Sequence, residues 1–306
     1  MPPADLSTAV RVRVPAKINL HLGVGALRPD GYHELTTVFQ AVTVYDEVIA
    51  HHGLGLSVTV SGEQAADVPT GADNLAWRAA ELIAAHEQLA PNVHLEVLKT
   101  IPVAGGMAGG SADAAATLLA CASLWGTNTL KPELMALAAQ LGSDVAFPLS
   151  GGTALGTGRG EQLTPVLTTG EFHWVFALAD FGISSGAAYA ELDRLRAAGL
   201  APEPIGSADA QLDALRAGDC ARLAATLAND LQAASLSLRP AIQGVLDAGA
   251  ASGALAGMIS GSGPTCAFLC QDAAAAQQLK LDLDASGLCR GSQVASAPAH
   301  GARIAI

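Results

Sequence analysis

A glycine-rich segment, residues 101–113, carries the clearest chemical signal in this sequence. It reads Ile-Pro-Val-Ala-Gly-Gly-Met-Ala-Gly-Gly-Ser-Ala-Asp, follows a strand-like run at 93–98 and leads into an Ala/Leu-rich run from Ser111. Glycine lets a ligand approach the backbone closely, and the N-terminus of a helix offers free N–H groups and the positive end of its dipole. The segment therefore predicts a cradle for an anion, of which phosphate is the usual one.

The two common phosphate-binding loops do not fit this segment. A Walker A loop needs a lysine after its second glycine, but Ser111 follows Gly110 here. The dinucleotide-binding fingerprint also fails, because Gly106 and Gly109 are separated by two residues instead of one. Taken alone, the segment leaves open whether it binds phosphate or is a packing turn.

Three polar residues elsewhere have types suited to phosphoryl chemistry. Lys17 is one of only four lysines, and it lies with Asn19 inside the apolar, strand-like run 14–20. Residues two apart on a strand share a face, so both side chains point the same way, either into a site or on an exposed face. Asp144 follows Gly142, where a carboxylate serves either as a helix cap or as a general base.

Composition narrows the class of partner. The chain has 306 residues, 50% hydrophobic but only 4% aromatic, which suffices for two domains with cores built mainly from Ala, Val and Leu. Its 16 basic and 28 acidic side chains give a net charge of −12, which argues against nucleic acid and anionic membranes as partners. A small-molecule substrate is the expected partner.

Cysteines and the chain start indicate the compartment. The five cysteines are scattered without zinc-type spacing, and the histidines show no metal-site spacing, so we expect reduced thiols and no metal site built from these residues. The first five residues lack the charged and apolar regions of a signal peptide, and no apolar run reaches the ~18 residues of a membrane helix. A cytoplasmic protein is the expectation.

Periodicity and breakers predict a mixture of strands and helices. We expect strands over 9–60 with a turn at Arg28–Gly31, a helix capped by Asp73, a strand at 93–99, and helices at 111–125 and 131–141. The later part predicts strands near 161–168, 173–179, 254–260 and 265–270, with helices at 185–197, within 209–250 and at 272–285. This order favours an α+β fold with domains at 1–160 and 161–306.

Three motifs in this order resemble those of the GHMP kinases. They are Pro-Ala-Lys-Ile-Asn-Leu at 15–20, the glycine-rich segment, and Ser-Gly-Ser-Gly-Pro-Thr at 260–265. The resemblance implies an N-terminal ribosomal protein S5 domain 2-like β/α domain, a C-terminal ferredoxin-like α+β domain and an active site in the cleft between them. Three further segments, at 28–34, 73–75 and 141–145, resemble members that act on a CDP-linked methylerythritol in non-mevalonate isoprenoid (terpenoid) biosynthesis.

The resemblance also implies roles for individual residues. ATP would be the donor with Mg²⁺, and CDP-methylerythritol the acceptor, phosphorylated on its 2-hydroxyl. Asp144 matches the catalytic base, and Lys17 matches the lysine that keeps Asp144 ionised and supplies the cation that the loop lacks. The residues that match nucleotide-binding positions are Asn74, Pro102, Val103, Ala104, Gly105, Gly106, Met107, Ala108, Gly109, Gly110, Ser111 and Ala112. Ser111 has three open roles, as a helix cap, a phosphate contact or a Mg²⁺ ligand.

The acceptor side rests on four residues. Tyr32 and His33 match the pair that recognises cytosine, by stacking and by hydrogen bonds to the base edge. An aromatic from the second domain closes over the base, for which Tyr189 is the first candidate and Phe181 the second. Asn19 is expected to orient the substrate near Lys17.

Two other functions remain as alternatives. One is a GHMP kinase that acts on another small alcohol. The other is a serine hydrolase, because residues 182–186 fit G-x-S-x-G around Ser184, and Asp193 or Asp230 with His300 would complete the order Ser, Asp, His. The hydrolase reading leaves the first domain unexplained.

Overall fold

Eight of the strands in the described chain form the first of two sheets. The computed structural model describes residues 9–305, so the five residues from which we predict no signal peptide lie outside it. The main path of the sheet is β12-β1-β2-β4-β3, with β5 paired to β2 and β6, and β8 paired to β1. Its strands are β1 (Ala9–Leu27), β2 (His33–His52), β3 (Leu56–Ser61), β4 (Val93–Leu98), β5 (Thr153–Thr157), β6 (Gln162–Pro165), β8 (Ala228–Asn229) and β12 (Arg303–Ile304).

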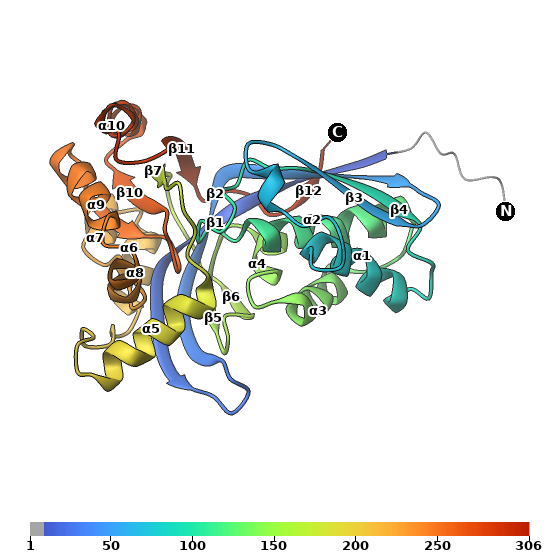
Figure 1. The fold of residues 1–306 in the computed structure, drawn as a ribbon, viewed down its shortest axis with the longest axis horizontal. Coiled ribbons are helices and arrows are strands. Elements are labelled where there is room, and N and C mark those ends of the chain that lie inside the picture. The colour runs from blue at the N-terminus through green and yellow to red at the C-terminus, as the bar shows by residue number, and fades with distance from the viewer. Residues whose placement is uncertain (1–8, 306) are drawn as a thin grey trace.

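Helices from the first half of the chain gather on one face of this sheet (Figure 1). They are α1 (Leu75–His86), α2 (Gly109–Leu124), α3 (Lys131–Leu141) and α4 (Ala146–Ser150). A short 3-10 turn, η1 (Ala65–Asp67), precedes α1.

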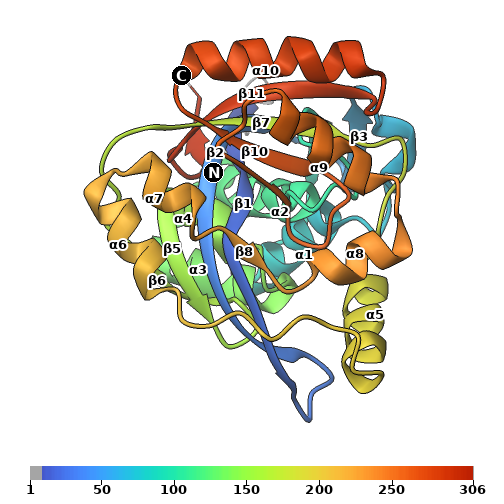
Figure 2. The ribbon, with the colours of Figure 1, turned by 90° about the vertical axis from the view of Figure 1, so that its left-hand side faces the viewer.

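The second sheet has four antiparallel strands in the order β11-β7-β10-β9. They are β7 (Phe172–Leu178), β9 (Ala256–Ile259), β10 (Cys266–Cys270) and β11 (Gly291–Ala297). Helices α9 (Ile242–Ala251) and α10 (Ala273–Ser286) pack on this sheet (Figure 2). Helices α5 (Ser185–Ala197), α6 (Asp209–Ala217), α7 (Cys220–Ala224) and α8 (Gln232–Leu238) complete this half.

Strand β7 is buried on both faces of the second sheet. Phe172, Trp174 and Phe176 belong to the core shared with the first sheet and its helices, whereas Val175 and Ala177 belong to the core under α9 and α10. The alternation follows from the two-residue period of a strand. The two halves of the molecule therefore share buried apolar surface.

Strands β1 and β2 form a long hairpin that reaches both halves. Lys17 pairs with Ala41 midway along it, and Leu27 pairs with His33 next to the turn. Strand β8, from the second half of the chain, pairs with β1 at His21 and Leu22. The register shifts three times along the hairpin, and such irregularities bend and twist strands.

Helix α2 lies in the interior because its side chains are small. Twelve of its sixteen residues are buried, and most of these are alanine or other small residues. Small side chains let a helix approach β1 and β2 closely, which explains how a chain with few aromatics fills this core. The N-terminus of α2 is thereby brought to the middle of the molecule.

The expected α+β architecture is confirmed, with corrections at element ends. Helix α1 begins at Leu75 with Asn74, not Asp73, as its N-cap, because the Asn74 side chain accepts a hydrogen bond from the Ala76 amide at 2.7 Å. Helix α2 begins at Gly109, before the expected Ser111. The first sheet also takes β6, β8 and β12 from beyond residue 160, so a division of the chain at 160 stays a prediction. Within residues 9–305, no helix combines the length and apolarity needed to cross a bilayer.

Candidate active site

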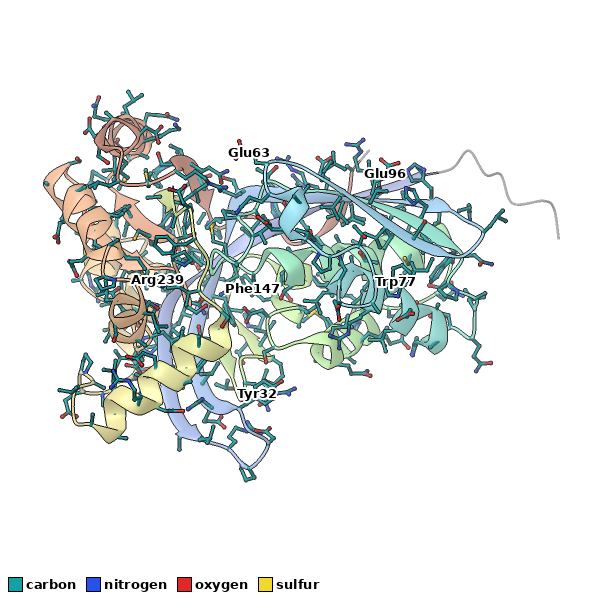
Figure 3. The ribbon with its side chains drawn as sticks, in the orientation of Figure 1. Tyr32, Glu63, Trp77, Glu96, Phe147 and Arg239 are labelled. Atoms are coloured by element: carbon teal, nitrogen blue, oxygen red, sulfur yellow. The ribbon has the colours of Figure 1, made fainter. Side chains whose placement is uncertain are left out.

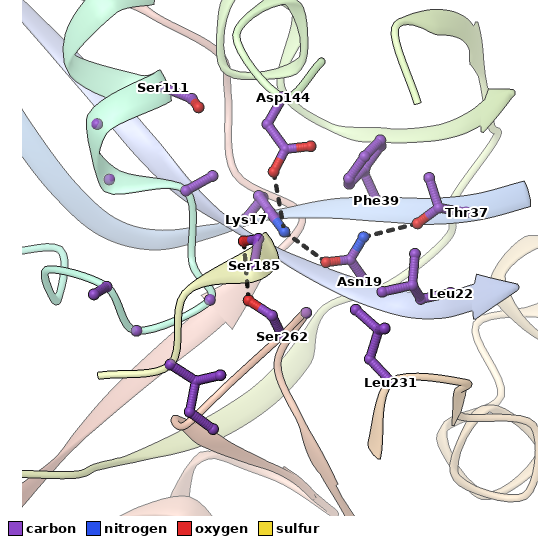
Figure 4. Close-up of a pocket in the computed structure, with 18 of the residues that line it drawn as sticks. Lys17, Asn19, Leu22, Thr37, Phe39, Ser111, Asp144, Ser185, Leu231 and Ser262 are labelled. Carbon is purple, nitrogen blue, oxygen red and sulfur yellow. Dashed lines mark hydrogen bonds and ion pairs between the residues drawn. The ribbon is translucent and has the colours of Figure 1, made fainter. Parts of the chain in front are cut away.

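Lys17 stands at the centre of a hydrogen-bonded chain of side chains (Figure 4). Its Nζ donates to Asn19 Oδ1 at 2.6 Å and lies 3.4 Å from Asp144 Oδ2. Asn19 Nδ2 donates to Thr37 Oγ1 at 2.8 Å, and Thr37 Oγ1 donates to the His21 carbonyl at 2.7 Å. Lys17 and Asn19 are buried on one face of β1, as their spacing predicts, and the amine is held in place by Asn19 and Asp144.

The glycine-rich loop wraps a cavity of about 300 Å³ beside Lys17. Ala104, Gly106 and Ala108 have φ of 52°, 77° and 59°, so the loop uses the left-handed region three times. Ala108 is the N-cap residue of α2, and no side chain caps the helix there, which leaves its first N–H groups for a ligand. The loop residues that line the cavity are Pro102, Ala104, Gly105, Gly106, Ala108, Gly109, Gly110 and Ser111.

The loop is fixed from both sides by backbone contacts. The Lys17 amide donates to the Met107 carbonyl at 3.3 Å, which ties the loop to β1. Ser260 Oγ donates to the Gly106 carbonyl at 3.1 Å, so the third sequence motif contacts the loop directly. A Cβ on Gly106 would lie 2.0 Å from the Ser260 carbonyl oxygen, and only glycine permits this approach.

A second cavity, of about 550 Å³, adjoins the first. Tyr32, His33 and Tyr189 line it, and Asp144 and Ser111 line both cavities. The His33 and Tyr189 rings stack with centroids 5.2 Å apart, and His33 Nε2 lies 3.0 Å from Asp193 Oδ1. Burial, with a smaller effect of the Asp144 carboxylate, raises the pKa of Tyr189, so its hydroxyl is neutral. Phe181 lines neither cavity, which favours Tyr189 as the second aromatic.

Four of the predicted nucleotide-binding residues do not line the first cavity. Asn74 uses both polar atoms locally, since Nδ2 donates to the Pro69 carbonyl at 2.6 Å and Oδ1 caps α1. The Val103 amide donates to Gln64 Oε1 at 3.0 Å, and Met107 is fully buried. Ala112 lies within α2, where its amide donates to the Ala108 carbonyl. A role for these residues in nucleotide binding stays a prediction. Ser111 does not cap the helix, which leaves a phosphate contact or a metal ligand.

A buried ion cluster beneath the loop was not foreseen from the sequence. Lys99 pairs with Asp46 and, at 2.7 Å, with Asp113, the fifth residue of α2. Asp46 Oδ1 also accepts hydrogen bonds from the amides of Thr100 and Ile101 at 2.6 and 2.8 Å. The cluster therefore joins β2, the end of β4 and α2 where the loop begins. Lys99 is one of only four lysines in the sequence, and this scarcity is the signal from which the cluster could have been suspected.

Burial controls the protonation of Asp113 within this cluster. It raises the pKa of Asp113 to about 8, and the nearby Lys99 amine only partly opposes this rise. The carboxyl therefore titrates far above its ordinary range.

Two further residues support the predicted ones. Thr37 holds Asn19, and Asp193 holds His33. Both come from segments distant in sequence from their partners, so spacing could not reveal them.

The hydrolase residues are not assembled. Ser184 Oγ accepts from the Ala187 amide at 3.2 Å as the N-cap of α5, Asp193 contacts His33, and Asp230 pairs with Arg196. His300 lies in a bridge with Gly151, and among the described residues no side-chain hydrogen bond joins it to any of them.

Family models identify the class of protein that this fold and site define. The model of the GHMP kinases N terminal domain matches residues 74–152, and that of the GHMP kinases C terminal matches residues 211–287. The chain belongs to the GHMP kinase family and is a phosphotransferase, which implies ATP as its phosphoryl donor.

Individual relatives point to one branch of that family. The chain is 54% identical to 4-diphosphocytidyl-2-C-methyl-D-erythritol kinase of Salinispora arenicola, over 99% of this chain and 96% of the relative. A crystal structure of 4-(cytidine 5'-diphospho)-2C-methyl-D-erythritol kinase matches at 30% identity with a TM-score of 0.76, covering 94% of this chain and 99% of that one. Homoserine kinase from Cytophaga hutchinsonii shares the fold alone, with a TM-score of 0.76 at 17% identity and 98% coverage of both chains.

Proposed function

We propose that this chain transfers the γ-phosphoryl group of ATP to the 2-hydroxyl of 4-diphosphocytidyl-2-C-methyl-D-erythritol, giving the 2-phosphate and ADP. One observation carries this proposal: the Lys17–Asp144 pair lies where the glycine-loop cavity meets the cavity lined by Tyr32 and His33. The donor phosphates would lie in the first cavity and the cytidine end of the acceptor in the second. The names of the relatives at more than half identity support the choice of acceptor.

The transfer step needs a base, a cation and donors for the phosphates. The Asp144 carboxylate takes the proton of the 2-hydroxyl as the acceptor oxygen bonds to the γ-phosphorus, and the bond from that phosphorus to the bridging oxygen of ADP breaks. Lys17 remains protonated and balances charge on the transferring group. The N–H groups at the start of α2 donate hydrogen bonds to the remaining phosphate oxygens.

A magnesium ion fits this site. Mg²⁺ takes oxygen ligands and is usually bound by one or two carboxylates together with substrate phosphates. The Ser111 hydroxyl lines both cavities and is suited to hold it together with the ATP phosphates, whereas Asp144, which also lines both, is assigned to the proton of the acceptor. When bound, the ion would neutralise charge on the ATP phosphates. Within the described residues, no cluster of three or more His, Cys, Asp or Glu side chains forms an independent metal site.

Different residues are assigned to the two ends of the acceptor. We assign Tyr32, His33 and Tyr189 to the cytosine, and Asn19 to the methylerythritol end near Lys17. We also propose a cytoplasmic setting, which the five free cysteines support.

A substrate panel tests the proposal. Purified protein with ATP and Mg²⁺ should release ADP with 4-diphosphocytidyl-2-C-methyl-D-erythritol and not with mevalonate or homoserine, and ³¹P NMR should show one new phosphomonoester. Release of ADP with mevalonate or homoserine alone would show that the chain phosphorylates another small alcohol.

A further inference from the structure

Arg159 is a cation at the acceptor cavity that the proposed transfer step does not use. It lies in the turn between β5 and β6, between Gly158 and Gly160, which both have positive φ. Its guanidinium carbon lies 4.8 Å from the centroid of the Tyr32 ring, and both side chains line the second cavity. Figure 3 shows Tyr32 next to the β1–β2 hairpin. Arg159 thus stands beside the ring assigned to the cytosine.

Backbone contacts fix the position of this turn relative to the base site. The Leu35 amide donates to the Gly158 carbonyl at 2.7 Å, which ties the turn to β2 two residues beyond His33. The Arg159 amide donates to Glu161 Oε2 at 2.7 Å. Glu161 therefore braces the turn and forms no ion pair with the guanidinium.

The charges around the cavity leave Arg159 available for an anion. Asp144 and Asp193 line the same cavity, and Arg159 is the one lysine or arginine among its lining residues. Lys17, in the adjoining cavity, already contacts Asn19 and Asp144. No ion pair in residues 9–305 involves Arg159. Among residues 9–305, its guanidinium contacts the Tyr32 ring alone, and an exposed cation–π contact is weak enough to exchange.

The acceptor presents an anion that needs such a group. A nucleoside diphosphate carries phosphate charge between its base and the distal alcohol, and this chain has a net charge of −12. An anionic acceptor entering a cavity lined by two carboxylates is repelled unless a local cation compensates. The planar guanidinium donates paired hydrogen bonds to phosphate oxygens, which suits a diphosphate better than a lysine does.

We propose that Arg159 binds the diphosphate of the acceptor, between the cytosine at Tyr32 and the hydroxyl at Asp144, and so makes the site select a nucleoside diphosphate over a bare nucleoside. The inference rests on the proposed function for the identity of the acceptor. It adds a residue to the substrate site and assigns it the phosphates instead of the base.

Binding of CDP and cytidine separates this role from base stacking. The dissociation constants of both are measured by calorimetry for the wild type, Arg159→Gln and Arg159→Lys, with Arg216→Gln as a surface control. We expect Arg159→Gln to weaken CDP about tenfold, as the loss of a charged phosphate contact does, and to leave cytidine within about twofold. The affinity of Arg159→Lys for CDP should lie between those of the wild type and Arg159→Gln, because lysine keeps the charge but cannot donate the paired hydrogen bonds of a guanidinium. The preference of the wild type for CDP should also shrink as ionic strength rises.

Steady-state kinetics give a second readout. The KM for 4-diphosphocytidyl-2-C-methyl-D-erythritol should rise in Arg159→Gln, while the KM for ATP should stay near the wild-type value. Unchanged CDP affinity, or equal losses for CDP and cytidine, would overturn the inference, the latter because Arg159 would then act only through Tyr32. Wild-type turnover of the acceptor alongside either result leaves the proposed function standing. If the wild type does not turn over this acceptor but binds CDP in a way that depends on Arg159, the proposed acceptor is wrong and the phosphate site stands.

Discussion

The Lys17 side chain is held before any substrate binds. Only 4% of the residue is exposed, and its amine contacts Asn19 directly and Asp144 across 3.4 Å. Burying an ammonium group is costly unless it is paired and hydrogen-bonded, so these contacts keep the charge in place. An amine held this way needs little reorganisation when charge develops on a transferring phosphoryl group.

Replacing Asp144 by asparagine tests its assigned role as the base. The amide keeps the size of the side chain but cannot take a proton, so kcat should fall by ~10²–10⁴-fold. Affinity for an ATP analogue and the melting temperature should stay close to wild type, because Asp144 is half-buried and caps no helix. Activity and differential scanning calorimetry provide the measurements, with Asp213→Asn, in a surface ion pair, as the control. A large loss of stability with normal turnover would instead make Asp144 structural.

For single residues, the sequence predicted which side chains share a face better than it predicted their hydrogen-bond partners. Lys17 and Asn19 share a buried face because strand alternation is a local property. Asn74 was interpreted through the resemblance, whereas the structure shows its side chain capping α1. The contacts that Thr37 makes with Asn19 and Asp193 makes with His33 were not predicted, because hydrogen bonds between distant segments leave no local pattern.

Among the elements, the glycine-rich loop depends on its fit against the loop at 260–265. The Gly106 backbone has φ of 77°, and its carbonyl accepts from Ser260. The Ser260 backbone oxygen occupies the space that a side chain at position 106 would need. The third motif is therefore a structural partner of the loop.

Gly106→Ala should disturb this contact and the nucleotide site together. The added Cβ would lie 2.0 Å from the Ser260 oxygen at a positive φ, so we expect a loss of more than about 1 kcal/mol of stability and a higher KM for ATP. Gly244→Ala is the matched control, because nothing lies within 4 Å of a Cβ there and the residue is inside α9. Replacing that helical glycine should be neutral or stabilising by roughly 0.5–1 kcal/mol. Urea unfolding and ATP kinetics of both variants test this prediction. Wild-type stability and KM for Gly106→Ala would contradict the close approach of Gly106 to Ser260.

Element existence was more predictable than element ends. The helix at 185–197 and the strand at 93–98 follow their periodicity, because each buries one face. The start of α2 moved to Gly109 because Ala108 adopts a left-handed conformation, which alanine disfavours and the packed loop imposes.

For the molecule as a whole, the Lys99 cluster makes stability depend on pH. The Asp113 pKa is raised to about 8 by burial from an ordinary 3.8, so between these values the folded protein binds a proton that the unfolded chain releases. The stabilisation from this carboxyl is fully present below 3.8 and is lost as pH rises through about 8.

Asp113→Asn isolates this contribution. Urea unfolding at several pH values from 5 to 8 gives the free energy of unfolding of both proteins. The difference, wild type minus variant, should fall with rising pH by up to about 1.4 kcal/mol per pH unit, the limit for one proton. His21 has the opposite dependence, because burial lowers its pKa, but it is present in both proteins and cancels. A flat difference would mean that Asp113 stays ionised in the folded protein.

For the whole chain, the fold class was predictable from the sequence, but the order in which strands join the sheets was less so. Motif order indicated the family, and the alternation of elements indicated α+β. The return of β8 and β12 to the first sheet was not predicted, because strands of two residues carry too little pattern to recognise.

The β1–β2 hairpin carries Lys17 midway along its length and Tyr32 and His33 at its turn, whereas the glycine-rich loop is built by other segments. The loop proposed to bind the donor phosphates and the residues proposed to select the acceptor therefore lie on separate pieces of chain. Substitutions confined to the hairpin tip, the facing side of α5 and the turn that carries Arg159 would redirect such a scaffold to a new alcohol while its phosphoryl-transfer residues stayed intact. A few short stretches of chain around one cavity would then be enough for evolution, or a designer, to exchange one substrate for another.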